Sequence, residues 1–517
     1  MTRMPPRALL IALALLAVGP AAAAVAAPRP NVVLFVTDDQ TLAQYNERSM
    51  PRTQRLLGNE GTTFTDAVVT TPLCCPSRAT MITGQYGHNN GVLRNNYGDL
   101  RAKDNTLPVW LRRAGYTTAH VGKYMNQYAE SVNPDSEPAP GWDEWHSVIT
   151  PRYYDYELMV NGRTKRFGVA PEDYLDRVQT ERSTELVDNY APRRKPFYLQ
   201  LDHYAPHISI GEVQGRCSDA AVPDPLDADR FADEPLPTSP NFNESDVSDK
   251  PSFIQELPLL EEPEIDGERR LNGCALASLA SVDRSVAAVH RAVKRAGELD
   301  ETVFIFLSDN GFFAGEHRIP VSKQNAYEES LRVPFVISAP RKLLRGRSPS
   351  RSGLPVANLD LAPTILELAG AAPCRAGGDC RRLDGRSLVP LLEGRRKAWP
   401  RDRSIVVELD RGKSPVESDG RACDYTGVRT TTGFWVEHRA AIDPASGECT
   451  PLPDGPEYEL YDLEADPFQL TSLDSALPGT PEAAFYSNLA ARSERLRDCA
   501  GIKGRDPRPG NGRTWCE

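Results

Sequence analysis

The sequence predicts an α/β protein with a large, mostly parallel mixed β-sheet sandwiched by helices, followed by a smaller C-terminal α+β subdomain on an antiparallel sheet. Two observations support this fold class. Four short apolar runs, rich in β-branched and aromatic residues, are separated by long helical stretches, which is typical of buried parallel strands with crossover helices. After about residue 400 the runs become short and closely spaced, as in antiparallel sheets.

The four predicted buried strands are "NVVLFV" (31–36), "YTTAHV" (116–121), the start of "PFYLQLDHYAPH" (196–207) and "TVFIFLSDNG" (302–311). Helices are expected at 106–115, which ends on a glycine suited to the C′ position, and at 275–297, where apolar residues recur at helical spacing. Residues 130–175 are rich in Pro, Tyr and Asp, and residues 211–265 are rich in Pro, Asp and Glu. We expect both to be long surface excursions that shape access to a substrate.

The C-terminal region contains three candidate strands, "RSIVVELD", "GVRTTTGFWVEH" and "EYELYDLEADP", followed by the helical "EAAFYSNLAARSERLRDCA". The predicted organisation is a signal peptide at 1–27, an α/β domain at 28–395 that would carry the site, and an α+β subdomain at 396–517.

The first residues have the pattern of a secretory signal. Arg3 and Arg7 precede an apolar run at 8–18 and a small-residue zone at 21–27. The run is too short to span a bilayer, so we expect a secreted or periplasmic protein without a membrane anchor after signal cleavage; an uncleaved anchor is the alternative. The formal net charge of −11 argues against nucleic acid and anionic membranes as partners.

The chain contains ten cysteines. Without the adjacent Cys74 and Cys75, eight remain, and export would permit them to form disulfides. They can pair in many ways, but sequential pairing is favoured because each bond then closes a local loop: Cys217–Cys274, Cys374–Cys380, Cys423–Cys449 and Cys499–Cys516. None of the eight has CxxC spacing, which argues against structural zinc.

Polar residues follow the predicted strands: Asp38 and Asp39 after the first, Asp309 and Asn310 after the fourth. Because ligands gather beyond the carboxyl ends of parallel strands, these side chains are expected to meet. They offer only oxygen donors, which suits Ca²⁺ first and Mg²⁺ second. The alternative is that both pairs are ordinary turn or helix-cap residues.

The stretch "TPLCCPSRAT" (71–80) places two thiols beside an arginine. Adjacent cysteines seldom pair with each other, because the short link strains the disulfide. Nearby positive charge from Arg78, Lys123 and Lys323 would lower a thiol pKa, so a reactive thiolate is one interpretation, and a disulfide to a distant cysteine is another. Neither explains why Pro76 and Arg78 accompany the pair.

The segment "LCCPSRATMITGQYGHNNGV" resembles the C-x-P-S-R signature of the formylglycine-dependent sulfatases of the alkaline phosphatase superfamily. Further similar segments span nearly the whole mature chain: "RPNVVLFVTDDQ", "VGKYMNQY", "APH", "FLSDNGFFAGEHRIPVSKQNAYEESLRVP" and "ELYDLEADPFQLTSL". The details, including "NFNESDVSDKP", look most similar to the glycosaminoglycan branch typified by N-acetylglucosamine-6-sulfatase.

The resemblance implies that a maturase oxidises Cys74 to Cα-formylglycine. In the family the aldehyde hydrates to a gem-diol, and one hydroxyl attacks sulfur and displaces the alcohol. The second hydroxyl then loses its proton, the aldehyde re-forms, and sulfate leaves. A sulfuric ester hydrolase acting on sulfated sugars or aryl sulfates is therefore expected. The alternatives are a phosphonate or phosphate ester hydrolase with the same site, and an inactive protein that binds sulfated glycans.

The resemblance also implies a role for each matching residue. Asp38, Asp39, Asp309 and Asn310 would hold Ca²⁺ together with the modified Cys74. Arg78 would hold the hydrated aldehyde, and Lys123, Lys323 and His207 would contact sulfate. Either His207 or Lys323 would protonate the leaving oxygen. His317 is a candidate for a further contact, with turn stabilisation as its alternative. One departure is Met125, which stands where many arylsulfatases have a histidine.

Overall fold

The computed structural model describes residues 29–131, 138–193, 195–213, 215–346, 348–412, 422–443, 445–475 and 478–517. The predicted signal peptide lies outside the described residues. Among the helices of the described ranges, none is both long enough and apolar enough to cross a membrane.

The main sheet has ten strands in the order β11-β2-β10-β9-β1-β8-β4-β5-β6-β7. The five central strands, β9, β1, β8, β4 and β5, are parallel to one another, whereas β10, β6 and β7 pair antiparallel. The strands are β1 (Asn31–Thr37), β2 (Thr62–Phe64), β4 (Thr117–Gly122), β5 (Glu144–Val148), β6 (Glu157–Val160), β7 (Arg163–Arg166), β8 (Phe197–Asp202), β9 (Thr302–Ser308), β10 (Phe335–Ser338) and β11 (Arg351–Ser352). The predicted mixed, mostly parallel sheet is confirmed.

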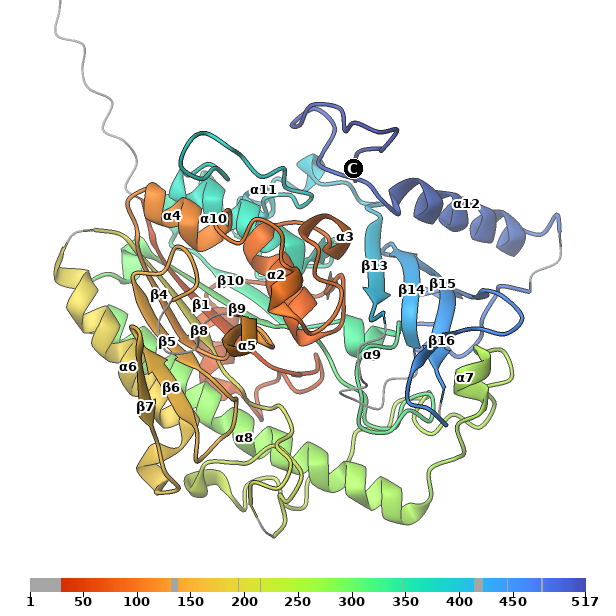
Figure 1. The fold of residues 1–517 in the computed structure, drawn as a ribbon, viewed down its shortest axis with the longest axis horizontal. Helices are drawn as coiled ribbons and strands as arrows, with labels where there is room; N and C mark the ends of the chain where they lie inside the picture. Colours follow the sequence, from red (N-terminus) through yellow and green to blue (C-terminus); the bar gives the residue numbers. More distant parts are fainter. Residues whose placement is uncertain are drawn as a thin grey trace, which may run out of the picture.

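The four predicted buried strands are β1, β4, β8 and β9, and β1 illustrates why they read as continuous apolar runs. Its residues alternate between the two faces of the sheet, and both faces are covered by helices. Val32, Leu34 and Val36 pack into the core shared with α2 (Cys74–Thr83), α4 (Leu107–Arg113) and α10 (Leu361–Ala369). Val33 and Phe35 pack on the opposite face, towards α6 (Leu175–Tyr190) and α8 (Glu262–Arg295) (Figure 1).

Residues 130–175 are not only a surface excursion, as expected, because they contain β5, β6 and β7 and thereby extend the main sheet. Their tyrosines explain the difference. Tyr153 and Tyr156 are buried in the core under α6 and α8, so aromatic rings supply the apolar burial that aliphatic side chains supply elsewhere.

The long helix α8 begins at Glu262, thirteen residues before the predicted start at 275. Its first turns are mostly exposed and polar, so they lack the apolar periodicity on which the prediction depended. A capping box between Glu261 and Glu264 begins the helix. The predicted helix at 106–115 is α4, and Gly115 adopts φ 93° just after it.

Shorter elements connect these layers: the helices α1 (Pro51–Thr53), α3 (Gly87–Asn90), α5 (Tyr128–Ser131), α7 (Ser252–Gln255), α9 (Glu328–Leu331) and α11 (Val389–Leu392), and the paired strands β3 (Ala67–Val68) and β12 (Val356–Ala357).

The predicted C-terminal antiparallel sheet is confirmed and consists of β13 (Ile405–Asp410), β14 (Ala422–Arg429), β15 (Gly433–Ile442), β16 (Cys449–Pro451) and β17 (Glu457–Asp462), with α12 (Pro481–Leu496) beside it (Figure 1). The fully buried Arg403 joins this part to the rest: its Nη2 donates to Asp360 (2.8 Å) and its Nε to Glu517 (2.5 Å). The domain boundary at 395/396 stays a prediction.

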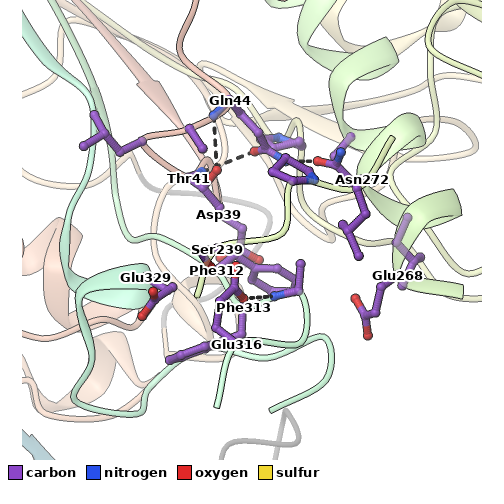
Figure 2. Close-up of a pocket in the computed structure, with 18 of the residues that line it drawn as sticks. Asp39, Thr41, Gln44, Ser239, Glu268, Asn272, Phe312, Phe313, Glu316 and Glu329 are labelled. Atoms are coloured by element: carbon purple, nitrogen blue, oxygen red, sulfur yellow. Dashed lines mark hydrogen bonds between the residues drawn. The ribbon is translucent and has the colours of Figure 1, made fainter. Parts of the chain in front are cut away.

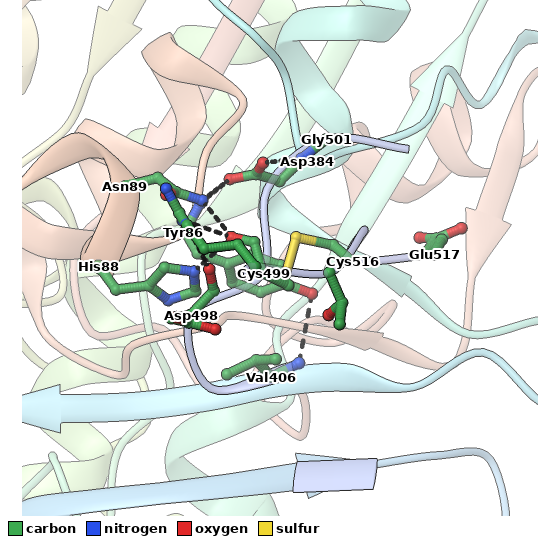
Figure 3. The surroundings of a disulfide bond; sticks show 12 residues. Tyr86, His88, Asn89, Asp384, Val406, Asp498, Cys499, Gly501, Cys516 and Glu517 are labelled. Carbon is green, nitrogen blue, oxygen red and sulfur yellow. Dashed lines mark hydrogen bonds between the residues drawn. A yellow bond between two sulfur atoms is a disulfide. The ribbon is translucent and has the colours of Figure 1, made fainter. Parts of the chain in front are cut away.

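All four sequential disulfides are present: Cys217–Cys274, Cys374–Cys380, Cys423–Cys449 and Cys499–Cys516. Figure 3 shows Cys499–Cys516 beside His88 of α3 and Val406 of β13. Nδ1 of His88 lies 2.8 Å from Oε2 of Glu408, and its Nε2 lies 3.0 Å from the carbonyl of Cys499. The C-terminal segment is therefore held against both parts of the molecule.

Candidate active site

The predicted oxygen donors meet at the carboxyl ends of β1 and β9, which are adjacent parallel strands. One oxygen each of Asp38, Asp39 and Asp309 lies within 4.8 Å of the others. The backbone N–H of Asp39 donates to Oδ1 of Asp309 (3.2 Å), and Nδ2 of Asn310 donates to Oδ1 of Asp39 (2.6 Å). The parallel register thus brings together carboxylates that are about 270 residues apart in the chain.

Cys74 is the first residue of α2, and Leu73 before it has an extended backbone. Its free, buried thiol reaches the carboxylate cluster, with Sγ 3.5 Å from Oδ1 of Asp38. Nζ of Lys323 lies 3.0 Å from the same sulfur. The first cysteine of the pair therefore faces the cluster, whereas the second, Cys75, is buried in the core that contains α4 and α10.

Arg78 lies one turn further along α2 and is only 3% exposed. Its Nε donates to Oδ2 of Asp309 (2.8 Å) and its Nη1 to the backbone carbonyl of Lys123 (2.8 Å). Its Nη2 lies 3.4 Å from Asp38. The guanidinium thus contacts residues at the ends of β9, β4 and β1. Its planar group with several N–H donors in fixed directions is suited to such simultaneous contacts.

Two lysines and a histidine complete the cluster. Lys123, which follows β4, pairs with Asp38, and Nζ of Lys323 donates to Oδ1 of Asp39 (2.6 Å). Nδ1 of His207 lies 2.6 Å from the carbonyl of Ile208, so Nδ1 carries the proton and Nε2 faces Asp39 Oδ2 at 3.6 Å. The carboxylates of Asp38, Asp39 and Asp309 therefore share one buried site with the cations of Arg78, Lys123 and Lys323.

The pKa values of the site follow from burial and these pairings. Burial alone would raise the pKa of Asp38, but Lys123 and then His207 and Arg78 outweigh it and hold that pKa below its usual range. Burial, and then the Asp38 carboxylate, raise the pKa of Asp309. Burial lowers the pKa of His207 to about 4, against the opposing effect of Asp39. The imidazole is therefore neutral near pH 7.

The structure disfavours both simpler interpretations of Cys74. A disulfide to a distant cysteine is wrong, because Cys74 is free. A reactive thiolate is disfavoured because burial, and then the Asp38 carboxylate, raise the pKa of Cys74 to about 12 despite the nearby lysines. At neutral pH the group is a thiol rather than a nucleophilic thiolate.

His317 makes its side-chain contacts away from this cluster. Its Nδ1 lies 2.7 Å from Glu244 and its Nε2 is 3.0 Å from Nδ2 of Asn241, while its ring stacks on Tyr327. With its own φ of 53°, it stabilises the turn that follows Phe313. Its role as a sulfate contact stays a prediction.

Asp202 is a site residue that the sequence analysis did not single out. It ends β8, and its Oδ2 lies 3.0 Å from Nε2 of His120 and 3.6 Å from Nη1 of Arg78. Nε2 of Gln200 donates to the same oxygen (2.8 Å). The rule that placed Asp38 and Asp309 at strand ends could have found it, because Asp202 is the last residue of a neighbouring parallel strand, where the register sets it opposite Val36.

The residues of the cluster fit a hard divalent cation. The donors are all oxygens, and Oδ1 of Asn310 is buried without a hydrogen-bond partner among the described residues. A buried acceptor without a donor is unfavourable, and a cation beside Asp39 and Asp309 would satisfy it.

A family model described as Sulfatase matches residues 30–371, which include every residue of the site described in this subsection. The chain belongs to the sulfatase family. The predicted family is thus confirmed. A relative similar over most of the chain is the N-acetylglucosamine-6-sulfatase of Homo sapiens, which is 30% identical over 511 residues, covering 93% of this chain and 86% of that protein.

Two other sulfatases match over a smaller share of their own length. The arylsulfatase of Volvox carteri is 35% identical over 70% of this chain, which spans 59% of that protein. The extracellular sulfatase SULF-1 homolog of Drosophila melanogaster is 32% identical over 75% of this chain, which spans 34% of that protein.

Solved structures share the fold of this sulfatase-family chain. One, described as a complex with its substrate D-glucosamine-2-N,6-O-disulfate, has a TM-score of 0.71 at 22% identity and covers 90% of this chain and 98% of its own. The phosphonate monoester hydrolase of Agrobacterium radiobacter has a TM-score of 0.65 at 20% identity, covering 91% and 95%. At these identities the likeness concerns the fold alone.

Proposed function

We propose that this chain hydrolyses sulfate esters of sugars or aryl alcohols after a maturase has oxidised Cys74 to Cα-formylglycine. The observation that carries the proposal is the position of the Cys74 side chain. It is a free, protonated thiol held between Lys323 and Asp38, which makes it a poor nucleophile where a nucleophile is needed. Conversion to an aldehyde, whose hydrate supplies oxygen nucleophiles, resolves this conflict.

The cation that we propose for the carboxylate cluster is Ca²⁺, with Mg²⁺ second, held by Asp38, Asp39, Asp309, Asn310 and the modified residue 74. When bound, the ion supplies a Lewis acid that polarises a sulfate oxygen. The all-oxygen donor set and the partnerless Oδ1 of Asn310 support this assignment.

The remaining roles rest on charge and geometry. Arg78 fixes the strand ends around residue 74 through Asp309 and the Lys123 carbonyl. Lys123 and Lys323 keep their protons, because carboxylates outweigh the effect of burial and raise both pKa values. They provide positive charge where negative charge develops on sulfate. Of the two predicted donors to the leaving oxygen, His207 and Lys323, the neutral His207 directs an unprotonated Nε2 to the site. Lys323 is therefore the candidate that carries a proton there.

We also propose that the protein is exported, to the periplasm or the medium, and three observations support this. The sequence begins with the charge and apolar pattern of a signal peptide. The described residues form four disulfides, which persist in oxidising compartments. A relative is described as extracellular.

The test combines mass spectrometry with turnover. Protein co-expressed with a maturase is expected to contain an aldehyde at residue 74 and to hydrolyse 4-nitrophenyl sulfate, whereas Cys74→Ala should fold but lack this activity. Full turnover by Cys74→Ala, or an unmodified thiol in the active protein, would refute the proposal. Faster hydrolysis of 4-nitrophenyl phosphonate than of the sulfate would favour the phosphonate hydrolase instead. Sulfated-glycan binding without turnover by modified protein would favour the inactive binding protein.

A further inference from the structure

A cavity of about 420 Å³ adjoins the carboxylate cluster at Asp39. Pro206 and Ile208, the two neighbours of His207, also line it. Further walls come from the loop after β1, residues 234–239, the first half of α8 and the segment after β9 (Figure 2). Ala221, Glu328, Glu329, Arg332, Pro467 and Phe468 complete the lining. The cavity therefore begins where the proposed sulfate site ends, in the position expected for the alcohol part of an ester.

The walls of this cavity combine apolar surface with negative charge. Phe312 and Phe313 lie between Glu268 and Glu329 in Figure 2, and Leu271 and Ala275 add aliphatic surface. Six lining residues are acidic, whereas the basic one, Arg332, lies 3.6 Å from Glu328. Lys323 is directed to Asp39 and Cys74. Asp39, Glu234 and Glu328 are paired with Lys323, Arg48 and Arg429, whereas Glu268, Glu316 and Glu329 have no paired lysine or arginine among the described residues. An anionic group beside these last three would meet carboxyl groups without a cation to balance them.

Glu268 is the side chain that points to a ligand. It is only 5% exposed. Its Oε1 accepts the N–H of Val321 (3.0 Å), but its Oε2 has no hydrogen-bond partner among the described residues. Figure 2 shows its carboxyl group directed into the cavity. Burial raises its pKa to about 7 even though the N–H of Val321 opposes the shift, which is the expected response of a buried carboxyl group without a cationic partner.

On the basis of the proposed sulfatase activity, we infer that this cavity holds the leaving ring of the ester and selects one that carries a hydrogen-bond donor, preferably an ammonium, and no second anionic group. Glu268 accepts the donor, while Phe312 and Phe313 pack against the ring. A sulfated amino sugar with a free amine fits this chemistry, and a neutral N-acetylated sugar fits it less well. An N-sulfated or uronate-bearing ring does not fit. The selection would therefore differ from that of the solved neighbour whose substrate is described as a 2-N,6-O-disulfate.

The cavity lining also indicates which of the two predicted surface excursions would affect substrate specificity. The cavity lining includes Glu234, Leu236, Pro237 and Ser239 from the predicted excursion at 211–265. From the excursion at 130–175, the lining contains no residue within the described part of the chain.

The experiment compares three 6-O-sulfate esters that differ only at the nitrogen: glucosamine 6-sulfate, N-acetylglucosamine 6-sulfate and glucosamine 2-N,6-O-disulfate. For the aldehyde-containing protein, kcat/KM is expected to be highest for the free amine and lowest for the disulfate. Glu268→Gln should reduce the preference for the free amine over the N-acetyl ester by about tenfold, the scale of one hydrogen bond to a charged group. Glu262→Gln, an exposed carboxylate on the same helix, is the matched control and should leave this preference unchanged.

Equal kcat/KM for the disulfate and the free amine, or the same preference in Glu268→Gln and Glu262→Gln, would overturn the inference. Turnover of 4-nitrophenyl sulfate reports separately on the proposed function. If that turnover is absent, calorimetric titration of the protein with glucosamine, N-acetylglucosamine and glucuronate still tests the selectivity inferred for the cavity. Glucosamine should bind most tightly and lose its advantage in Glu268→Gln, whereas glucuronate binding as tightly as glucosamine would refute the inference.

Discussion

Replacement of Lys323 by methionine tests whether the cluster at Asp39 is a cation site. The substitution keeps an unbranched side chain that is one atom shorter and removes the ammonium that lies 2.6 Å from Oδ1 of Asp39. Without a bound cation, Asp39 then becomes a buried carboxylate that has lost its closest cation, since Nε2 of the neutral His207 is 3.6 Å away. Removing one partner of a buried ion pair is destabilising by about 3–5 kcal/mol. Because the amide of Asn310 still donates to Asp39, we expect the lower end of this range, about 3 kcal/mol.

The expected shift in melting temperature follows from the size of the chain. With an unfolding entropy of about 2.1 cal/mol/K per residue, a protein of 517 residues loses about 1 °C in Tm for each kcal/mol. Lys323→Met should therefore melt about 3 °C below the parent in chelator. In calcium the ion compensates Asp39 and no longer meets the repulsion of the ammonium, so the calcium-induced rise in Tm should be about 3 °C larger in the variant than in the parent.

Differential scanning calorimetry in chelator, calcium and magnesium measures these shifts. The matched control is Lys250→Met, because Lys250 is also buried and ion-paired, with Nζ 2.9 Å from Asp249 and 3.5 Å from Glu244, but lies outside the cluster. Its loss of Tm should be the same with and without calcium. The reasoning is refuted if the calcium-induced rise in Lys323→Met equals that of the parent. With the aldehyde present, Lys323→Met should also lower kcat about 100- to 1000-fold, as for loss of one group that stabilises transition-state charge.

Three further predictions concern contacts around the site and between the parts of the molecule. Asp202→Asn should lower kcat/KM about tenfold with little change in Tm, as for other residues that position a site side chain. An unchanged kcat/KM would contradict a positioning role for Asp202 towards Arg78. Replacing Cys423 and Cys449 by serine opens a loop of 26 residues and should reduce the free energy of unfolding by about 3.5 kcal/mol. The same change at Cys374 and Cys380, which are 6 residues apart, should reduce it by about 2 kcal/mol. Denaturant titrations that show the reverse order would contradict the loop-length argument. Burial opposes protonation of His88, but Glu408 outweighs it and raises the pKa of His88 to about 9, so this pairing stabilises the fold fully below the unfolded value of about 6.5 and is lost as pH rises through about 9. The Tm of the parent should therefore fall more steeply than that of His88→Gln between these pH values, and parallel profiles would exclude the pairing.

The sequence by itself was sufficient for features that depend on local pattern or chain topology. The β1, β4, β8 and β9 strands are apolar runs because helices cover both faces of the sheet, and parallel strands place their ends at one edge. Asp38 and Asp309 could therefore be brought together from their positions alone. The signature around Cys74 was sufficient to identify the family. The preference for closing local loops was sufficient to predict the disulfide pairing.

Other features were decided only by the tertiary structure, because they depend on which side chains surround a group rather than on its place in the chain. The pKa of Cys74 could not be predicted from the nearby lysines, since burial and Asp38 outweigh them. The contacts of His317 lie with Glu244 and Asn241, residues in a segment with little regular structure. Glu268 was hidden in the polar start of α8, and only packing shows that one of its oxygens lacks a partner inside a cavity. The burial and the ion pairing of a side chain depend on residues from many distant parts of the chain, so short-range sequence patterns do not reveal them.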